Sequence, residues 1–530
     1  MKTIYYGTIL TMEDDHPQAE AICIEDGVIQ AVGKKEEVMK WKDEETRCID
    51  LQDHVLMPSF IDPHSHFVGV ANSLSQCDLS EAKSFQDIIK KMRDFIERRK
   101  IQPGEWVHGN AYDHNFLREQ CHPSRHILDE ISTEHPIVIG HASSHMGVVN
   151  TLGLEMMKLD RQTKDPDGGK YGRDTDGTLT GYMEENAYIT LVNALPMASP
   201  ESLMKLMKEA QQIYASYGIT TVQDGFVGRP LFQLLDYAAK SKILYLDIVG
   251  YIDLNHCRKL LAEQPSYVKQ YQNHFKIGGY KIFLDGSPQG RTAWMTTPYL
   301  GDEVDYYGYP VLTDDRLHEL IAMAVEDDMQ LLAHCNGDAA AQQYLDQFKE
   351  VQKEYPDAET NRPVMIHGQL VREDQLKLML PLHMIPSFFI AHTYFWGDIH
   401  IRNFGKERAD LISPAGSAVK LGMPFTFHQD SPVIQPDMIR TIWCAVNRRT
   451  RTGVSIGEEQ CITPYEALKA VTIHAAYQYF EEDHKGSLCP GKLADLVILN
   501  HNPLTVDPKD LANLLVLETI KEGMTIYTRE

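Results

Sequence analysis

The chain has 530 residues, of which 43% are hydrophobic and 24% charged, and its formal net charge at pH 7 is -24. A globular protein of this length buries a large core, and the length indicates roughly two to four domains unless one is a large barrel. The acidic charge argues against a nucleic-acid partner, because phosphate recognition requires clustered lysine and arginine. The amino-terminal residues lack a signal-peptide pattern, and apolar runs are shorter than the roughly 18 residues of a membrane span. We therefore expect a soluble, cytoplasmic protein without a membrane partner.

The nine cysteines are scattered along the chain and include no Cys-x-x-Cys pair. This pattern indicates neither a disulfide framework nor a structural zinc knot. We expect reduced thiols.

Strand patterns occupy both ends of the chain. Residues 1–56 contain short apolar strands with a hairpin signal at Asp26-Gly27, and residues 481–530 contain a Pro-Gly turn followed by further strands. We predict that the two ends pair into one composite β-sandwich domain.

Between the ends, over residues 57–480, strand patterns alternate with helix patterns. One helix is predicted after Ser199, which is a favourable N-cap residue. Pro200 is favourable in the first turn of this helix, and Gly218 is favourable where the helix ends. The eight strand candidates are residues 56–64, 219–225, 242–252, 278–286, 329–338, 363–370, 383–389 and 423–430. Setting aside an insertion after the first strand leaves roughly 32 residues for each βα unit, which predicts an α/β protein with a (β/α)8 TIM-type barrel.

The insertion, residues 71–215, contains a helical pattern at residues 84–100 and a polar Gly/Asp-rich segment at residues 163–181. We predict that it forms a lid or cap over the barrel mouth.

The most informative segment is LMPSFIDPHSHF, residues 56–67, where an apolar strand pattern ends in Asp62, His64 and His66. Side chains alternate along a strand, so residues two apart share a face and can bind one metal ion. The alternative is a strand end with two solvated histidines, and the rest of the chain must decide between them.

Further polar residues lie where the predicted barrel strands end, and the active sites of such barrels lie at that edge. Lys281 lies in the fourth strand, His334 and His367 end the fifth and sixth, and Asp430 ends the eighth. Zinc-type cations favour His nitrogen and Asp oxygen, and a catalytic site keeps one position open for water. Taken alone, His334 or His367 is compatible with a buried core histidine whose hydrogen bonds are satisfied, and Asp430 is compatible with a helix N-cap. The joint placement of these residues at strand ends favours metal-assisted hydrolysis.

Seven motifs along nearly the whole chain carry a family resemblance. They are MPSFIDPHSHF, GGYKIFLDGSPQGRTA, LLAHCNGDAA, MIHGQL, FHQDSPV, ITPYEALKAVTIHAA and GSLCPGKLADLVILN. In this order they closely resemble the amidohydrolase superfamily, specifically the amidohydrolase 3 branch of YtcJ-like proteins and N-substituted formamide deformylases.

The resemblance implies a centre of two divalent metal ions, with zinc as the expected metal and manganese or iron as alternatives. In this pattern His64 and His66 hold one ion, and His334 and His367 hold the other. Lys281, carboxylated by carbon dioxide, bridges the two. A single-ion centre with an ordinary cationic Lys281 is the alternative, because an unmodified lysine repels a metal ion.

The resemblance also implies that Asp430 is the catalytic residue, which binds metal and carries a proton from the attacking water to the leaving amine. A metal ion lowers the pKa of water to about 7, and proton transfer of this kind contributes about 10²- to 10⁴-fold. The chain departs from the branch at Gln429, where serine is common, and at His428, where a small residue is common. Asp338 stands in place of the Glu of a deaminase pattern, which argues against nucleobase deamination.

Six further residues are predicted to bind the substrate. Four of them match positions that recur in relatives, and these are His145, Glu185, His392 and Trp396. The other two are Arg291 and Trp294, which together with Trp106 are expected to enclose an apolar N-substituent. For Glu185 a role as an additional metal ligand and a plain surface position are the alternatives, and a buried tryptophan is often simply core.

The leading hypothesis is a metal-dependent hydrolase that cleaves the carbon–nitrogen bond of a linear amide, such as an N-substituted formamide or an N-acyl amine. One alternative is hydrolysis of a cyclic amide or imidazolone, and another is a catalytically silent regulatory or binding protein. A small-molecule amide is the expected partner, and a homodimer is the default assembly.

Overall fold

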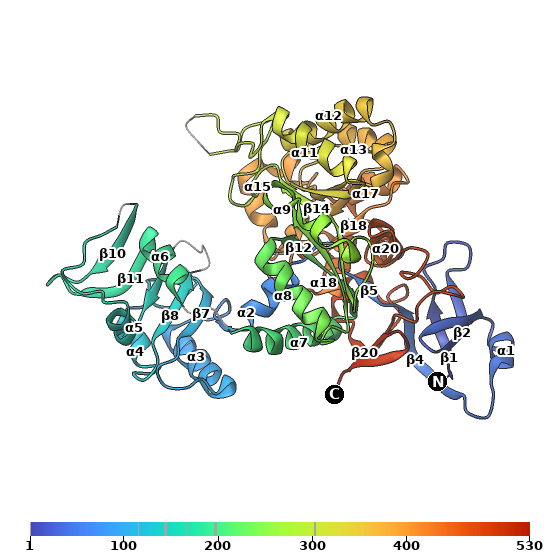
Figure 1. The fold of residues 1–530 in the computed structure, drawn as a ribbon, viewed down its shortest axis with the longest axis horizontal. Helices are drawn as coiled ribbons and strands as arrows, with labels where there is room; N and C mark the ends of the chain where they lie inside the picture. The colour runs from blue at the N-terminus through green and yellow to red at the C-terminus, as the bar shows by residue number, and fades with distance from the viewer. Residues whose placement is uncertain (1, 115, 142–145, 167, 196–198, 302–303) are drawn as a thin grey trace. The chain divides into compact units, whose positions relative to one another are not determined.

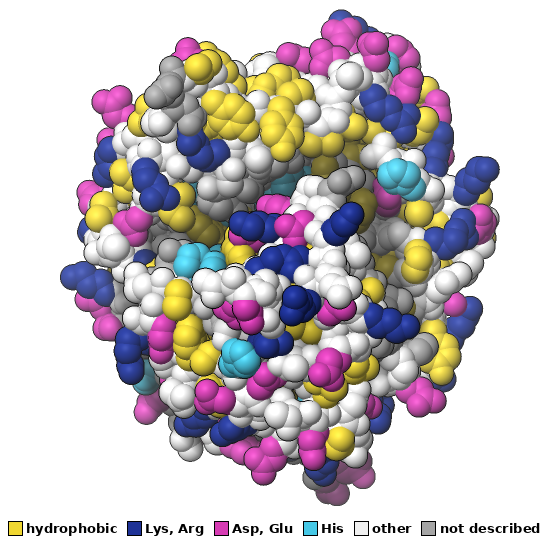
Figure 2. Space-filling model, turned by 90° about the vertical axis from the view of Figure 1, so that its left-hand side faces the viewer, with side chains coloured by type: hydrophobic (Ala, Val, Ile, Leu, Met, Phe, Trp, Pro, Cys, Tyr) yellow, Lys and Arg dark blue, Asp and Glu magenta, His cyan; other side chains and the backbone are white. Residues whose placement is uncertain are grey.

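The structure is a computed structural model that describes the chain apart from residues 1, 115, 142–145, 167, 196–198 and 302–303. The described residues form two compact units, one of residues 1–70 and 207–530 and the other of residues 71–206. Among the described residues, helices that combine the length and the apolar character needed to cross a membrane are absent. Figure 2 shows Lys and Arg side chains interspersed with Asp and Glu side chains, so the two signs of charge are mixed on that face.

A curled, all-parallel sheet of eight strands forms the centre of the first unit, and it confirms the predicted (β/α)8-type barrel (Figure 1). Its order is β5-β12-β13-β14-β15-β16-β17-β18. The bounds are β5 Phe60–Ile61, β12 Ile219–Val227, β13 Asp247–Asp253, β14 Phe275–Phe283, β15 Gln330–Cys335, β16 Val364–His367, β17 Ile385–Phe388 and β18 Thr426–Phe427. The ends of the sheet meet where the backbone N–H of His66 donates to the carbonyl of Ser431 at 2.8 Å.

Helices follow the barrel strands. Their bounds are α8 Arg229–Lys240, α9 Leu254–Cys257, α10 Leu260–Glu263, α11 Asp314–Glu326, α12 Asp338–Glu354, α13 Glu373–Met379, α14 His392–Phe395, α15 Gly397–Phe404, α16 Lys406–Ala409, α17 Ala415–Lys420, α18 Met438–Asn447, α19 Pro464–Ala470 and α20 Ile473–Gln478. The chain leaves the first unit within α2 (Phe67–Ser73) and returns to it within α7 (Pro200–Ser216).

The barrel strands are short apolar runs because each is covered on both faces. All residues of β13 are buried, and Val249, Leu332, Val364 and Ile366 pack together in the barrel core. Strands buried on both sides read as continuous hydrophobic runs, which is why the sequence located them. The polar residues at their carboxyl ends therefore stand out from the pattern.

Both ends of the chain contribute to one continuous sheet of seven strands, in the order β21-β20-β19-β4-β1-β2-β3. The bounds are β1 Lys2–Leu10, β2 Gln18–Glu25, β3 Val28–Gly33, β4 Arg47–Pro58, β19 Leu496–Leu499, β20 Val516–Lys521 and β21 Met524–Thr528, and the short helix α1 (Lys35–Val38) follows β3. The predicted hairpin turn at Asp26-Gly27 joins β2 to β3, and both residues have positive φ. The strand β4 leads directly into the first barrel strand.

The unit of residues 71–206 contains a six-stranded sheet in the order β10-β11-β9-β8-β7-β6. The bounds are β6 Gln76–Asp78, β7 Val107–Tyr112, β8 Ile137–His141, β9 Met146–Val149, β10 Gly169–Arg173 and β11 Leu179–Glu185, with helices α3 Phe85–Arg99, α4 Arg125–Asp129, α5 Thr151–Met156 and α6 Asn186–Ala194. The helix predicted at residues 84–100 is α3, and Ser84 caps it by accepting from the N–H of Asp87 at 3.2 Å. The sheet itself was not predicted.

Candidate metal centre

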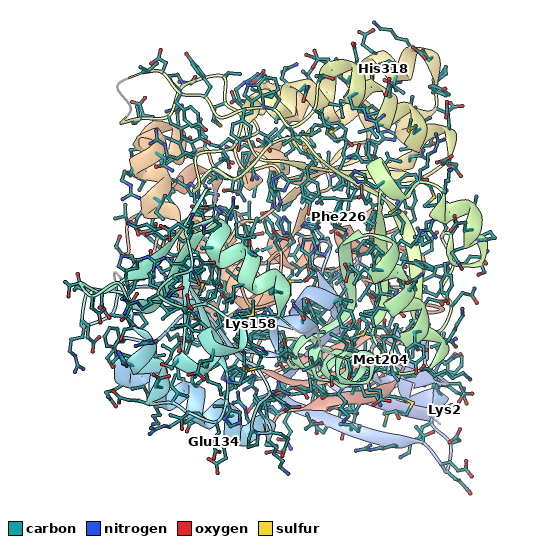
Figure 3. The ribbon with its side chains drawn as sticks, turned by 60° about the vertical axis from the view of Figure 1, so that its left-hand side comes forward. Lys2, Glu134, Lys158, Met204, Phe226 and His318 are labelled. Carbon is teal, nitrogen blue, oxygen red and sulfur yellow. The ribbon has the colours of Figure 1, made fainter. Side chains whose placement is uncertain are left out.

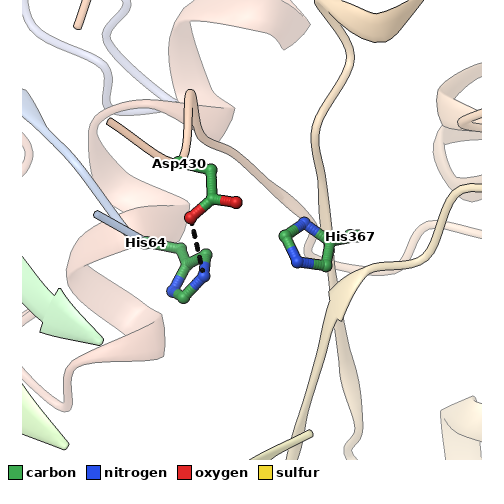
Figure 4. A group of neighbouring side chains, drawn as sticks. All are labelled: His64, His367 and Asp430. Carbon is green, nitrogen blue, oxygen red and sulfur yellow. Dashed lines mark ion pairs between the residues drawn. The ribbon is translucent and has the colours of Figure 1, made fainter. Parts of the chain in front are cut away.

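Three ligating side chains converge at the carboxyl ends of the barrel strands (Figure 4). His64 follows β5, His367 ends β16, and Asp430 follows β18. One ligand atom from each lies within 4.8 Å of the others. The curled parallel sheet brings together residues from distant parts of the chain, since parallel strands end at the same edge.

Asp430 lies between the two histidines of the first strand end. Its Oδ1 is 3.3 Å from Nε2 of His64 and 3.2 Å from Nε2 of His66. The Nζ of Lys281, from β14, lies 3.4 Å from the same His64 nitrogen. His64 and Lys281 are almost fully buried, whereas the His66 side chain is 32% exposed, so the group is reached by solvent from the His66 side.

A second pair of imidazole nitrogens comes from the next two strands. Nδ1 of His334, in β15, lies 3.0 Å from Nε2 of His367, and the two ring centroids are 4.5 Å apart. The ring of His367 also lies 5.5 Å from that of His64, which joins the two groups. The structure thus brings His64, His66, Lys281, His334, His367 and Asp430 together.

Outer hydrogen bonds fix which nitrogen of each ring faces the centre. The Nδ1–H of His64 donates to Oε1 of Gln223 at 2.6 Å, so its Nε2 lone pair points toward Asp430. The Nε2–H of His334 donates to the carbonyl of Gly286 at 3.1 Å, so its Nδ1 lone pair points toward His367. Such outer partners set the tautomer and orientation of metal-binding histidines.

Burial and mutual contact set the charges of these groups. Burial, together with the nearby charge of Lys281, lowers the pKa of both His64 and His334 to about 4. Burial alone raises the pKa of Asp430, but the imidazoles in close contact with its carboxylate outweigh burial and hold that pKa well below its usual range. Neutral imidazoles and an ionised carboxylate are the forms that bind a metal ion.

Two of the converging residues have a backbone conformation that is rare for side-chain-bearing residues. The φ angles are 75° at His367 and 54° at Asp430. A left-handed backbone at a non-glycine residue costs on the order of 1 kcal/mol and persists only where the surroundings enforce it. The strain lies at the two strand ends that bring a ligating atom to the centre.

His428 lies beside the ligating residues and is fully buried. Its ring centroid is 5.0 Å from that of His64 and 5.1 Å from that of His367. Among the described residues, both of its ring nitrogens lack a hydrogen-bond partner. A buried polar atom without a partner is costly, so a group bound in this centre would supply what the protein does not.

Aromatic side chains surround the polar centre. Phe226, at the end of β12 (Figure 3), packs against Phe283 of β14 with ring centroids 5.0 Å apart. Phe283 contacts His334, and Phe389 lies 5.2 Å from His428 on the other side. These rings lower the local polarity, which strengthens electrostatic interactions within the centre.

The donor set fits a divalent metal ion. The atoms involved are imidazole nitrogens and a carboxylate oxygen, which zinc-type cations prefer, and their separations of 3.0–3.3 Å suit atoms that share an ion. Tetrahedral zinc with bonds of about 2.0–2.2 Å holds its ligand atoms roughly 3.3–3.6 Å apart. The unpartnered nitrogens of His428 point to the same conclusion.

The residues predicted to bind substrate fall into different parts of the structure. Buried His392 packs against Phe389 and half-buried Trp396, both at 4.5 Å between centroids, so this group adjoins the centre. Arg291 and Trp294 lie in the segment after β14, where Arg291 donates to the carbonyl of Leu300 at 3.2 Å. In the 71–206 unit, Glu185 ends β11 with an exposed side chain, and Trp106 is partly buried and packs against the core. His145 lies outside the described residues.

Sequence reasoning missed two residues that support the histidines. Gln223 holds His64, and buried Asp285 accepts from the backbone N–H groups of Trp294, Asn336 and Gly337 at 2.7–3.0 Å, beside His334. The signal for Asp285 was present, because it follows an apolar strand as Asp430 does. Gln223 stands out only as a polar residue inside a buried strand.

Known proteins resemble this chain over nearly its whole length. The sequence model of the Amidohydrolase family matches residues 47–527. The chain is 27% identical to the putative amidohydrolase YtcJ of Bacillus subtilis (strain 168), covering 100% of both chains. It is 25% identical to N-substituted formamide deformylase of Arthrobacter pascens, covering 99% of this chain and 98% of the other. An uncharacterized metal-dependent hydrolase from Pyrococcus horikoshii OT3 has a similar fold, with a TM-score of 0.78 at 24% identity over 96% of this chain and 99% of that one.

Proposed function

The chain belongs to the amidohydrolase family and is a hydrolase, and from this premise we propose that it cleaves the carbon–nitrogen bond of a linear amide. The substrate class is an N-substituted formamide or another N-acyl amine. The observation that carries this proposal is the similarity to N-substituted formamide deformylase, which extends over 98% of that chain. The converging histidines and Asp430 support hydrolysis by a metal-dependent route.

In the proposed centre, His64 and His66 hold one divalent ion and His334 and His367 hold a second, with zinc as the metal. When bound, the ions polarise the amide carbonyl and lower the pKa of water to about 7. Asp430 is close enough to both histidines of the first pair, at 3.2–3.3 Å, to share their ion.

Asp430 is the proposed proton carrier. Its ionised carboxylate accepts a proton from the attacking water as the new carbon–oxygen bond forms. The same carboxyl group then delivers that proton to the amine nitrogen as the carbon–nitrogen bond breaks, so the products are a carboxylic acid and an amine. Phe226, Phe283 and Phe389 limit the contact of this exchange with bulk water.

Lys281 is proposed to bridge the two ions as a carboxylated lysine. Its Nζ is 3.4 Å from Nε2 of His64, a position in which an unmodified ammonium group would repel a metal ion. Burial lowers the pKa of Lys281 to about 7, so a neutral amine is available at neutral pH. A neutral amine adds to carbon dioxide and releases one proton, which leaves an anionic carbamate.

Carboxylation is tested with isotopically labelled bicarbonate and the full-length protein grown with zinc. We expect a carbamate resonance in the wild type that is missing from Lys281→Met, together with a lower zinc content in that variant by plasma mass spectrometry. Equal zinc content in the two proteins and no carbamate resonance would favour the single-ion centre with an unmodified lysine.

The substrate proposal is tested with matched linear and cyclic amides on zinc-loaded protein. N-substituted formamides and N-acyl amines should be hydrolysed faster than lactams and imidazolones. Faster turnover of the cyclic compounds would contradict the proposed substrate class. Turnover of neither class by metal-loaded protein would favour a regulatory or binding protein.

Asp430→Asn tests the mechanism, because an amide cannot accept and return the proton. We expect turnover to fall by about 10²- to 10⁴-fold. The control is Asp483→Asn, which removes an exposed carboxylate and should leave turnover unchanged. Wild-type turnover by Asp430→Asn would show that the proton travels by another route.

A further inference from the structure

A second group of ligating side chains lies at the carboxyl edge of the sheet in the 71–206 unit. Strands β7 and β8 are parallel neighbours there, and Tyr112 faces His141 in register. Asp113 and His114 follow β7 directly, while His141 ends β8. The same topological rule that gathers the barrel ligands therefore gathers these three residues, all within one unit.

The three ligand atoms have the separations of a shared ion. Nδ1 of His114 lies 3.1 Å from Nε2 of His141, and Oδ1 of Asp113 lies 3.5 Å from His141 and 3.9 Å from His114. All three atoms fall within 4.8 Å of one another. These distances bracket the roughly 3.3–3.6 Å between ligand atoms of tetrahedral zinc.

Neighbouring side chains hold the group in place. The ring of His122 packs 4.0 Å from that of His114, and its Nδ1 lies 2.9 Å from the hydroxyl of Tyr112. On its other side, His122 packs against Tyr182 at 4.5 Å.

A third group with similar spacing, formed by Asp247, His274 and Glu522, shows what argues against a metal site. Asp247 there accepts from Nζ of Lys485 at 2.6 Å and Nζ of Lys521 at 2.9 Å. Two ammonium groups already compensate its charge and would repel a metal ion. The Asp113 carboxylate lies beside the imidazoles of His114 and His141, whose ring nitrogens are of the type that binds a metal ion.

We propose that Asp113, His114 and His141 bind one zinc ion in the 71–206 unit, separate from the ions proposed for the barrel. Two imidazole nitrogens and one carboxylate oxygen make a three-ligand set, which leaves a fourth tetrahedral position for water or an oxygen-bearing ligand. The ion joins the segment after β7 to the end of β8. Its ligands come from no residue of the barrel centre.

The test is zinc content of the full-length protein after dialysis against buffered free zinc, measured by plasma mass spectrometry. His114→Ala and Asp113→Asn should each bind one zinc ion per chain fewer than the wild type. His126→Ala is the matched control, because it removes an exposed histidine from the same unit and should keep the full zinc content. Lys281→Met addresses the barrel ions and should retain the ion of the 71–206 unit.

Cobalt substitution gives a second readout, since tetrahedral cobalt with nitrogen and oxygen ligands absorbs visible light. The difference spectrum between wild type and His114→Ala should show this band, and His114→Cys should restore binding with a sulfur-to-metal band. If circular dichroism shows that His114→Ala is unfolded, the zinc content of the nearly isosteric variant Asp113→Asn tests the proposal instead. Zinc content equal to wild type in folded Asp113→Asn and His114→Ala would overturn the proposal and leave a hydrogen-bonded cluster.

Discussion

Single residues outside the ligand set decide how the barrel histidines present their nitrogens. Gln223 accepts from Nδ1–H of His64 through Oε1, and its Nε2 donates to the carbonyl of Pro63 at 2.7 Å. The amide is thereby held at both ends and cannot rotate without breaking a bond. The His64 tautomer therefore depends on a residue that does not contact the proposed ion.

Replacing Gln223 by Leu should weaken zinc binding by about 10- to 100-fold, because His64 loses the partner that fixes its tautomer and ring orientation. The measurement is competition with a chromophoric chelator on the full-length protein. Gln211→Leu is the control, since Gln211 is equally buried but bonds to Met207 and Ile243 away from the ligands. Equal losses of zinc affinity in both variants would mean that Gln223 acts only through stability.

At the scale of elements, the eight barrel strands were predictable because strands buried on both faces leave continuous apolar runs. Each predicted range overlaps an observed strand, although several ranges were longer than their strands, as at 423–430, where β18 is only Thr426–Phe427. The strand-end rule also found Lys281, His334, His367 and Asp430, which the fold brings together.

The sheet of the 71–206 unit was missed for a physical reason. Strand β7 mixes polar with apolar residues, reading VHGNAY, and β7 and β8 are interrupted by Gly109 and Gly140, where a side chain would clash with neighbouring atoms. Glycine breaks the alternating pattern by which strands are recognised. The histidine cluster of this unit was missed as well, since its members come from two strand ends that only the sheet makes adjacent.

Elements far apart in sequence are joined at the start of β13 by buried charges. Asp247 accepts from Lys485, which follows α20, and from Lys521, the last residue of β20. Burial alone raises the pKa of Asp247, but the two lysines hold it well below its usual range, and the carboxylates hold the pKa of Lys521 well above its own. These charges stabilise the fold above the unfolded pKa of Asp, about 4, and below that of Lys, about 10.4.

Asp247→Asn should therefore lower the free energy of unfolding at pH 7 by about 3–5 kcal/mol, because it removes the carboxylate that two buried ammonium groups share and leaves Lys485 with Glu481 and Lys521 with Asp495 and Glu522. Urea titration of the full-length protein measures this. The stabilisation is lost as pH falls through the depressed pKa of Asp247 or rises through the raised pKa of Lys521. Glu373→Gln, which breaks an exposed pair with Lys377, should cost less than about 0.5 kcal/mol, and a similar cost for both variants would contradict this account.

At the scale of the whole molecule, each unit has a core of its own. Ile88, Met92 and Ile137 pack within the 71–206 unit, whereas Leu332 and Ile366 pack inside the barrel. A compact unit with a separate core can open as one cooperative element while the rest of the chain stays folded. The organisation into two units therefore predicts that a destabilising substitution in one core promotes local unfolding mainly within its own unit.

Ile88→Ala removes fully buried apolar volume from the core of the 71–206 unit and should destabilise that unit by about 2–5 kcal/mol. Hydrogen exchange of the full-length protein, followed by mass spectrometry of peptides, should show faster exchange in residues 71–206 and unchanged exchange in β14 and β15. Leu332→Ala is the reciprocal variant and should accelerate exchange in the barrel strands instead. If Ile88→Ala accelerated exchange equally along the whole chain, the two units would open as one, and a zinc ion bound in the 71–206 unit would then stabilise the barrel centre as well.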